Sequence, residues 1–141
     1  MKKVIALALA TSALVGCSTL PANDQYQPQE MTSTIAARHA QNVRDRELGN
    51  EVAAITMIRF DTEFDGWKYQ EQAYFLIGKN KKAINGWQEW ADDTAASQCE
   101  NLTREFARQF TNVHQVESVV TAYIEGVDRP VFGSSQCKLH R

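Results

Sequence analysis

Three histidines and one pair of adjacent acids, Asp92-Asp93, are the residues of this sequence that could do acid–base or metal chemistry. His39, His114 and His140 lie far apart, and no two of them have the short spacing of metal ligands. None has a neighbouring nucleophile or orienting acid, so we expect all three at the surface. Asp92-Asp93 could form a paired acid site, but capping of the following helix explains the pair better. Since the sequence also lacks a glycine-rich phosphate loop and a Gly-x-Ser-x-Gly motif, we expect no enzymatic activity, no cofactor and no metal site.

Cys17 follows a short apolar segment with a positively charged head. Lys2 and Lys3 form the head, and residues 4–15 form an apolar run of the length of a signal-peptide core. The run is too short to span a bilayer, for which about 20 apolar residues are needed. Residues 14–17, Leu-Val-Gly-Cys, resemble a bacterial lipobox, which implies removal of residues 1–16 and acylation of Cys17. The alternative is an ordinary secretory signal that happens to end in cysteine.

The resemblance to bacterial lipoproteins implies permanent attachment to a membrane. Such a lipoprotein carries three acyl chains, palmitate among them, on the cysteine, and two or more chains make anchoring stable. In these proteins an aspartate after the cysteine favours retention in the inner membrane, and here that residue is Ser18. The resemblance therefore implies a lipid-anchored protein of the outer membrane that faces the periplasm.

Two further cysteines, Cys99 and Cys137, remain for other chemistry. In a periplasm-facing domain two cysteines are expected to form a disulfide bond. The bridge would close a loop of 39 residues, counted from Cys99 through Cys137, which the chain-entropy model values at roughly 4 kcal/mol. Metal binding is the competing interpretation, but two cysteines without suitably spaced histidines make a poor zinc site.

Length and charge indicate one ordinary domain. Removing residues 1–16 from the 141 leaves 125, which is enough for a single hydrophobic core. Loss of Lys2 and Lys3 leaves 13 basic against 17 acidic residues, a net charge of −4. No basic stripe is present, so we expect no nucleic-acid partner. Residues 17–31 contain two prolines and many amides, which predicts a flexible tether before a periplasmic domain over residues 32–141.

The first half of this domain is predicted to form a helix followed by a hairpin. Thr32 or Ser33 can cap a helix that ends near Gly49. Residues 51–60 are expected to form a strand, with Phe60 and Met57 on opposite faces. Residues 61–66 form a turn that ends in Asp-Gly, and the strand at 67–77 alternates clearly. Its buried face is expected to hold Trp67, Tyr69, Ala73, Phe75 and Ile77.

The second half of the domain is predicted to form helix followed by strands. Residues 83–92 are expected to form a short helix, although Asn85-Gly86 suits a helix interior poorly. A longer helix capped by Asp92 or Asp93 follows, with an apolar stripe of Ala95, Cys99, Leu102, Phe106 and Phe110. Strands are expected at 115–125 and 129–137, and Pro130 confines the last one to a sheet edge. The predicted fold is α+β, with about four strands in antiparallel hairpins packed against two to three helices in the order α-β-β-α-(α)-β-β, closed by one disulfide.

Binding is the function class that remains, and aromatic residues are its candidates. Trp87, Trp90 and Tyr74 could anchor a protein partner if they are exposed. The alternative, which we favour for Trp67 and Trp87, is that they belong to the core. A partner could bind as a helix in an apolar groove or as a strand added at the Pro130 edge.

The layout as a whole resembles the pilotin lipoproteins of type II secretion systems, in their small α+β branch. The shared features are the acylated cysteine, the polar tether, the leading helix and hairpin, and cysteines on a helix and on the last strand: Cys17, Cys99 and Cys137. The chain departs from that pattern because Cys99 comes early in a long helix rather than near a helix end. The resemblance implies binding of a secretin C-terminal segment and a role in its outer-membrane targeting. Type III pilotins are a neighbouring possibility, and the alternative function is a generic envelope lipoprotein that binds another envelope protein or peptidoglycan in a structural or inhibitory role.

Overall fold

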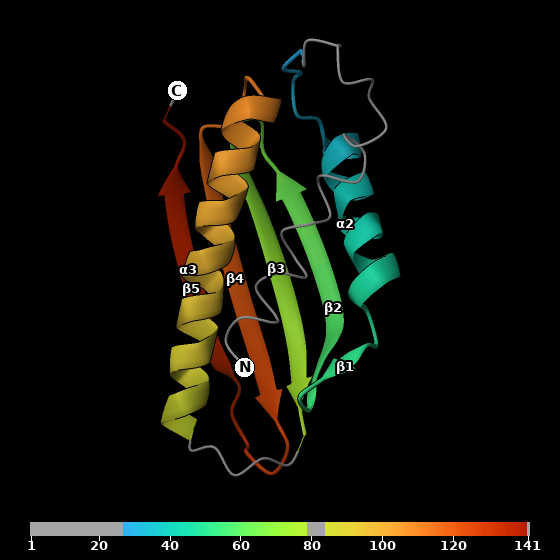
Figure 1. The fold of residues 1–141 in the computed structure, drawn as a ribbon, viewed down its shortest axis with the longest axis vertical. Coiled ribbons are helices and arrows are strands. Elements are labelled where there is room, and N and C mark those ends of the chain that lie inside the picture. The colour runs from blue at the N-terminus through green and yellow to red at the C-terminus, as the bar shows by residue number, and fades with distance from the viewer. Residues whose placement is uncertain (1–26, 79–83, 141) are drawn as a thin grey trace.

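The computed structural model describes residues 27–78 and 84–140, shown as coloured ribbon in Figure 1. The elements follow in the order α2 (Ser33–Glu47), β1 (Glu51–Val52), β2 (Ile55–Phe64), β3 (Lys68–Ile77), α3 (Ile84–Gln109), β4 (Gln115–Ile124) and β5 (Val131–Lys138). The five strands form one sheet in the order β1-β2-β3-β4-β5. The predicted α+β class is therefore confirmed, with two helices and five strands in the described residues.

The sheet is mixed rather than built only from antiparallel pairs. The two expected hairpins, β2–β3 and β4–β5, are present and antiparallel. Between them β3 and β4 pair in parallel over their whole length, from Lys68 with Gln115 to Ile77 with Ile124. The long helix α3 carries the chain back along the sheet, so that β4 starts at the same end as β3. A helix of this length is the usual connection between parallel neighbours.

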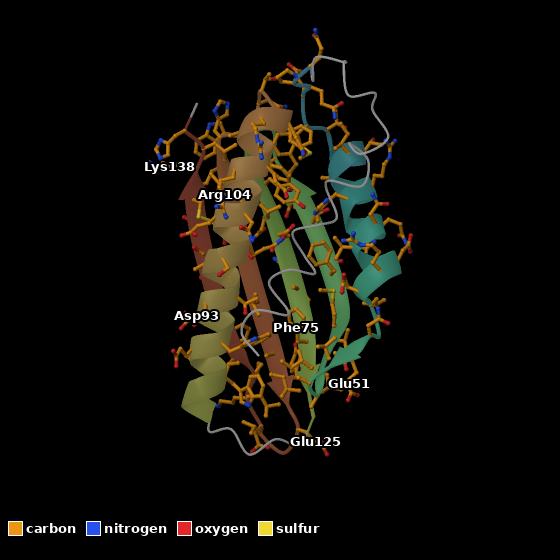
Figure 2. All side chains as sticks on the ribbon, in the orientation of Figure 1. Glu51, Phe75, Asp93, Arg104, Glu125 and Lys138 are labelled. Carbon is orange, nitrogen blue, oxygen red and sulfur yellow. A yellow bond between two sulfur atoms is a disulfide. The ribbon has the colours of Figure 1, made fainter. Side chains whose placement is uncertain are left out.

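The prediction of two separate helices between residues 83 and 110 is wrong. The chain forms a single helix of 26 residues from Ile84 to Gln109. Asn85-Gly86 is tolerated because it lies in the first turn, where the backbone N–H groups have no intrahelical partner to lose. Asp92 and Asp93 consequently cap nothing: they lie inside the helix and are exposed, with Asp93 on its outer side in Figure 2.

The strand expected at residues 51–60 is also different. Ala53 and Ala54 adopt left-handed backbone conformations, with φ of 53° and 66°, and divide it into β1 and β2. A β-bulge between Met57 and Arg59 then shifts the alternation by one residue, so Met57 and Phe60 both face the core. β2 continues to Phe64, and the turn consists of the expected Asp-Gly pair, where Gly66 has a φ of 95°, together with Trp67.

Both helices cover the same face of the sheet. Helix α2 packs on β2, and α3 packs on β4 and β5, as Figure 1 shows. Thr32 caps α2 as expected, since its hydroxyl accepts from the N–H of Ile35 at 3.1 Å. The apolar side chains of both helices and of the covered sheet face form the core, which includes Ala40, Val43, Phe60, Phe75, Ile77, Trp87, Trp90, Leu102, Phe106, Val116 and Val120. The opposite face of the sheet carries no helix of the described residues.

The last residues of the predicted tether belong to the folded structure. Gln29 pairs with Phe110 in an isolated parallel bridge at the end of α3. Met31 is buried, and Asn112 binds both its N–H (2.7 Å) and its carbonyl (3.0 Å). The start of α2 is thereby tied to the end of α3. Residues 1–26, which include the predicted signal peptide and Cys17, lie outside the described residues.

Strand β5 is held beneath α3 at two points. The expected disulfide joins Cys99 of α3 to Cys137 of β5, with Cα atoms 6.0 Å apart. Four residues earlier, Gly133 lies directly under the helix: a Cβ atom placed there would be 2.2 Å from the carbonyl oxygen of Ala91. The helix backbone can approach β5 this closely because residue 133 has no side chain.

Candidate partner-binding surface

Two of the three predicted binding residues are not on the surface. Trp87 and Trp90 are only 1% and 2% exposed, and their rings pack edge to face at 5.7 Å. Trp90 also packs against Phe75 at 5.4 Å. Because α3 is continuous, both indoles lie on its sheet-facing side, and neither can anchor a partner in this conformation. The exposed tryptophan is Trp67, which was expected in the core but precedes β3 and stacks on His114.

Tyr74, the third predicted binding residue, lies on the uncovered face of the sheet. Its hydroxyl donates to the Oε1 of Gln72 at 2.8 Å, and the guanidinium of Arg59 lies 5.3 Å from its ring centroid. These contacts orient the ring while leaving it half-buried at the surface. The alternation of β3 placed Tyr74 on this face correctly.

The strand registers arrange the uncovered face, called here the open face, in rows across the sheet. From one end to the other the rows are Thr56, Leu76, Tyr123; then Arg59, Tyr74, Thr121, Phe132; then Asp61, Gln72, Val119, Ser134; then Glu63, Gln70, Glu117, Gln136; and last Lys68, Gln115, Lys138. The first two rows contain most of the apolar side chains. The last two contain only polar and charged ones.

The apolar end of the open face carries an exposed patch, which we define as Leu76, Tyr123 and Phe132. Their exposed fractions are 47%, 42% and 58%. Leu76 and Tyr123 are direct neighbours on the parallel strands β3 and β4. Side chains on regular strands lose little further freedom on contact with a partner, and clustered exposed apolar groups mark interaction sites. This patch was not among the predicted site residues, although the alternation of each strand places all three side chains outward.

The polar end of the open face is internally neutralised. The ammonium of Lys68 lies 3.0 Å from the carboxylate of Glu117, and this hydrogen bond and charge raise the pKa of Lys68. Gln136 donates to the same carboxylate at 3.2 Å. Next to these residues a shallow depression of about 200 Å³ is lined by Arg59, Asp61, Thr62, Glu63, Gln70 and Gln72. Because Lys68 pairs with Glu117 and Arg59 pairs with Asp61, we describe this end as a polar rim rather than as a charged site.

A second group of polar residues lies under the helices. The carboxylate of Glu71 is 1% exposed and accepts from the Tyr69 hydroxyl at 2.9 Å and from the Gln98 amide at 2.7 Å. His39 Nε2 lies 3.5 Å from the same carboxylate, so the prediction of a surface position for His39 is wrong. Glu71 shares the inward parity of Tyr69 and Ala73, and that spacing could have identified it.

This buried cluster links α2, β3 and α3 and has the character of a structural network. Its donors converge on Glu71, which satisfies a charge that would otherwise be costly to bury. Burial, together with the charge and hydrogen bond of Glu71, raises the pKa of Tyr69 well above its usual value. The ring of His39 is enclosed by Phe60, Tyr69 and Phe106. We therefore assign the cluster to helix positioning rather than to chemistry on a ligand.

Glu105, on the same side of α3 as Gln98, is expected to make the stability of the fold depend on pH. Burial raises its pKa above the usual 4.5, and the nearby His39 opposes this shift. The folded state therefore keeps the proton of Glu105 to a higher pH than the unfolded chain does. As a result, the free energy of unfolding falls as pH rises from about 4.5 through the raised pKa. We expect Glu105→Gln to unfold at a higher denaturant concentration than wild type at pH 7 and at the same concentration at pH 3.5.

Denaturant titrations at the two pH values would measure this effect. Glu100→Gln is the matched control, because Glu100 is exposed on the same helix. Its difference from wild type should be the same at both pH values. An equal pH dependence for the two variants would contradict a destabilising ionisation of Glu105.

Other chemical features are sparse in the part of the chain that the structure describes. There, no group of three or more histidine, cysteine or acidic side chains could hold a metal ion. Within residues 27–78 and 84–140, no helix combines the length and the apolar character needed to cross a membrane. His114 and His140 are exposed, as expected.

Comparison of the chain with protein-family models, with curated proteins and with solved structures gives no significant match.

Proposed function

We propose that this protein is a lipid-anchored binding module of the bacterial outer membrane that captures a protein partner on its periplasmic side. The exposed patch of Leu76, Tyr123 and Phe132 on the open face is the observation that carries this proposal. A rigid apolar cluster next to a polar rim has the composition of a protein–protein interface. The apolar signal segment and Cys17 support the anchor.

The specific form of the proposal is a pilotin-like role. The partner is then the C-terminal segment of a secretin subunit, which the lipid anchor would carry to the outer membrane. The arrangement of Cys17, Cys99 and Cys137 along the chain supports this role, and so does the link between the long helix and the last strand. Such a role requires the protein to bind its partner and requires no catalysis.

Cross-linking and co-purification of the acylated protein from its native envelope would test the role. Mass spectrometry should identify a secretin, captured through its C-terminal end, and replacement of Cys17 by alanine should mislocalise that secretin. Normal secretin assembly in the Cys17→Ala strain would refute the pilotin role. Recovery of peptidoglycan or an unrelated envelope protein instead would favour the generic binding lipoprotein.

The patch itself yields a quantitative prediction. The double substitution Leu76→Ser and Tyr123→Ser should weaken binding of the captured partner at least about tenfold, since truncating a central apolar contact costs about 1–2 kcal/mol. The free energy of unfolding should change little because both side chains are exposed. Titration calorimetry with the purified partner measures the binding.

The matched control for this pair is Gln70→Ala with Gln115→Ala, at the polar end of the same face. We expect this control to bind within about twofold of wild type, as rim contacts contribute little. Equal losses in the two double variants would show that the patch has no special role.

A further inference from the structure

The two edges of the sheet are built differently. At one edge β1 has only two residues, and a bulge interrupts β2 between Met57 and Arg59. Arg44 of α2 also reaches this edge, where its Nε donates to the carbonyl of Phe60 at 2.8 Å. Short strands, bulges and covering charges are the devices that keep a sheet edge from pairing with another chain.

The opposite edge, β5, has fewer of these devices, although the side-chain amide of Gln88 on α3 binds the carbonyl of Phe132 there. It is a regular strand of eight residues, and Lys138 at its end is its single charged side chain. Pro130 precedes the strand and removes no donor from it. Among the residues that the structure describes, no further strand pairs with it. A regular edge strand of this length is a template for a further strand.

The hydrogen bonds identify which backbone groups of β5 are available. In an antiparallel pair, alternate residues bond to the neighbouring strand and the residues between them point the other way. The N–H of Leu139 donates to the carbonyl of His114 (3.0 Å), which places the odd-numbered residues on the β4 side. The amide of Gln88 on α3 donates to the carbonyl of Phe132 (2.5 Å), which places the even-numbered residues on the outer side. Ser134 and Gln136 therefore direct their N–H and C=O groups away from β4.

The edge is also fixed in an extended conformation. Gly133 and Cys137, on the inward side of the strand, hold β5 against α3 by close backbone approach and by the disulfide. These two points flank Ser134 and Gln136. The strand is thus pre-organised, so a partner that pairs with it has only its own backbone to order.

We propose that the outer edge of β5 binds an extended segment of a protein partner as a sixth strand. This inference rests on the proposed binding function and specifies its site and the conformation of its partner. The backbone donors and acceptors of alternate residues match the spacing of the same groups in another extended backbone. Phe132 belongs both to this edge strand and to the exposed patch, so apolar side chains of the added strand would extend the patch on the open face.

Site-specific photo-cross-linking of the full acylated protein in cells tests the proposal. A photo-cross-linking amino acid replaces Ser134 or Gln136 at the edge, and, in a separate strain, Leu76 on the open face. We expect the two edge positions to capture the same partner at sites two residues apart, as in a strand ladder. Sites three or four residues apart would indicate a helix and overturn the proposal, and so would capture of a second copy of this chain.

The remaining outcomes separate the two proposals. Capture from position 76 with none from positions 134 and 136 would overturn the edge site and leave the binding function standing. No capture from any of the three positions would overturn both.

A proline at position 134 provides an independent test. Ser134→Pro removes an outward N–H and obstructs strand addition, while the odd-numbered residues keep the ladder to β4. We expect capture of the partner from position 76 to fall at least tenfold with Ser134→Pro and to stay unchanged with Ser134→Ala. Unchanged capture by a folded Ser134→Pro variant would overturn the proposal. If this variant does not fold, the spacing of the cross-links from positions 134 and 136 is the test of whether the partner binds as a strand.

Discussion

Replacing Cys99 and Cys137 together by alanine should lower the free energy of unfolding by about 4 kcal/mol. The disulfide closes a loop across 38 positions of sequence, and without it the unfolded chain gains the entropy of that loop. The folded state also loses the covalent link that holds β5 against α3. Since a domain of this size is stable by about 5–15 kcal/mol, the loss is a large fraction of the whole.

Denaturant unfolding in a Cys17→Ser background, where no third thiol interferes, measures this loss. Treatment with a reductant is the control. The reduced Cys17→Ser protein should have an unfolding midpoint close to that of the double alanine variant, and the midpoint of the variant itself should not change on reduction. Thiol titration of the unfolded, non-reduced Cys17→Ser protein should find no free thiol. Equal unfolding midpoints for oxidised and reduced wild type would contradict a stabilising disulfide.

Replacing Gly133 by alanine should destabilise the domain by about 3 kcal/mol or prevent folding. The added Cβ would lie 2.2 Å from the carbonyl oxygen of Ala91 and 2.6 Å from the backbone nitrogen of Asp92. These are helix backbone atoms, which cannot turn aside as a side chain would. Helix α3 would have to move away from β5, at the upper end of the cost of overpacking a core.

Ser134→Ala is the matched control for this substitution, because the neighbouring side chain points to the open face. It should stay within about 0.5 kcal/mol of wild type. Thermal and denaturant unfolding would compare the two variants. A Gly133→Ala protein as stable as Ser134→Ala would mean that α3 and β5 are less closely packed than described.

Together the two contacts explain why the edge strand has a defined position. Both lie on inward-facing residues of β5, and both attach it to the same helix. Loosening either contact should also weaken capture of a partner at the β5 edge, because the partner would then have to order the strand on binding.

Local patterns in the sequence predicted the elements whose causes are local. The hydroxyl of Thr32 begins α2, and the Asp-Gly pair at 65–66 makes the β2–β3 turn. The alternation of residues 69–77 assigned the two faces of β3, including the outward position of Tyr74. Pro130 correctly indicated an edge position for the last strand. Such signals depend on neighbours within a few residues, which the sequence contains in full.

The sequence did not predict the features of the fold that depend on residues distant in the chain. Two irregularities arise where β2 must pair with both β1 and β3: the bulge at Met57/Arg59 and the left-handed pair Ala53-Ala54. Residues 51–60 by themselves contain no pattern that predicts either one. Asp92-Asp93 was expected to begin a second helix, yet the buried side of α3 runs past this pair without interruption, so packing on the sheet keeps the helix continuous.

For the candidate site, the sequence determined by itself which side chains of β3 and β4 point outward and which cysteines remained to pair. Only the tertiary structure decided that β3 and β4 are parallel neighbours, which brings Leu76 beside Tyr123. It also buried Trp90 and joined His39 to Glu71. The reason is physical: alternation along a strand is imposed by the backbone, whereas the identity of its neighbours depends on how distant apolar faces exclude water together.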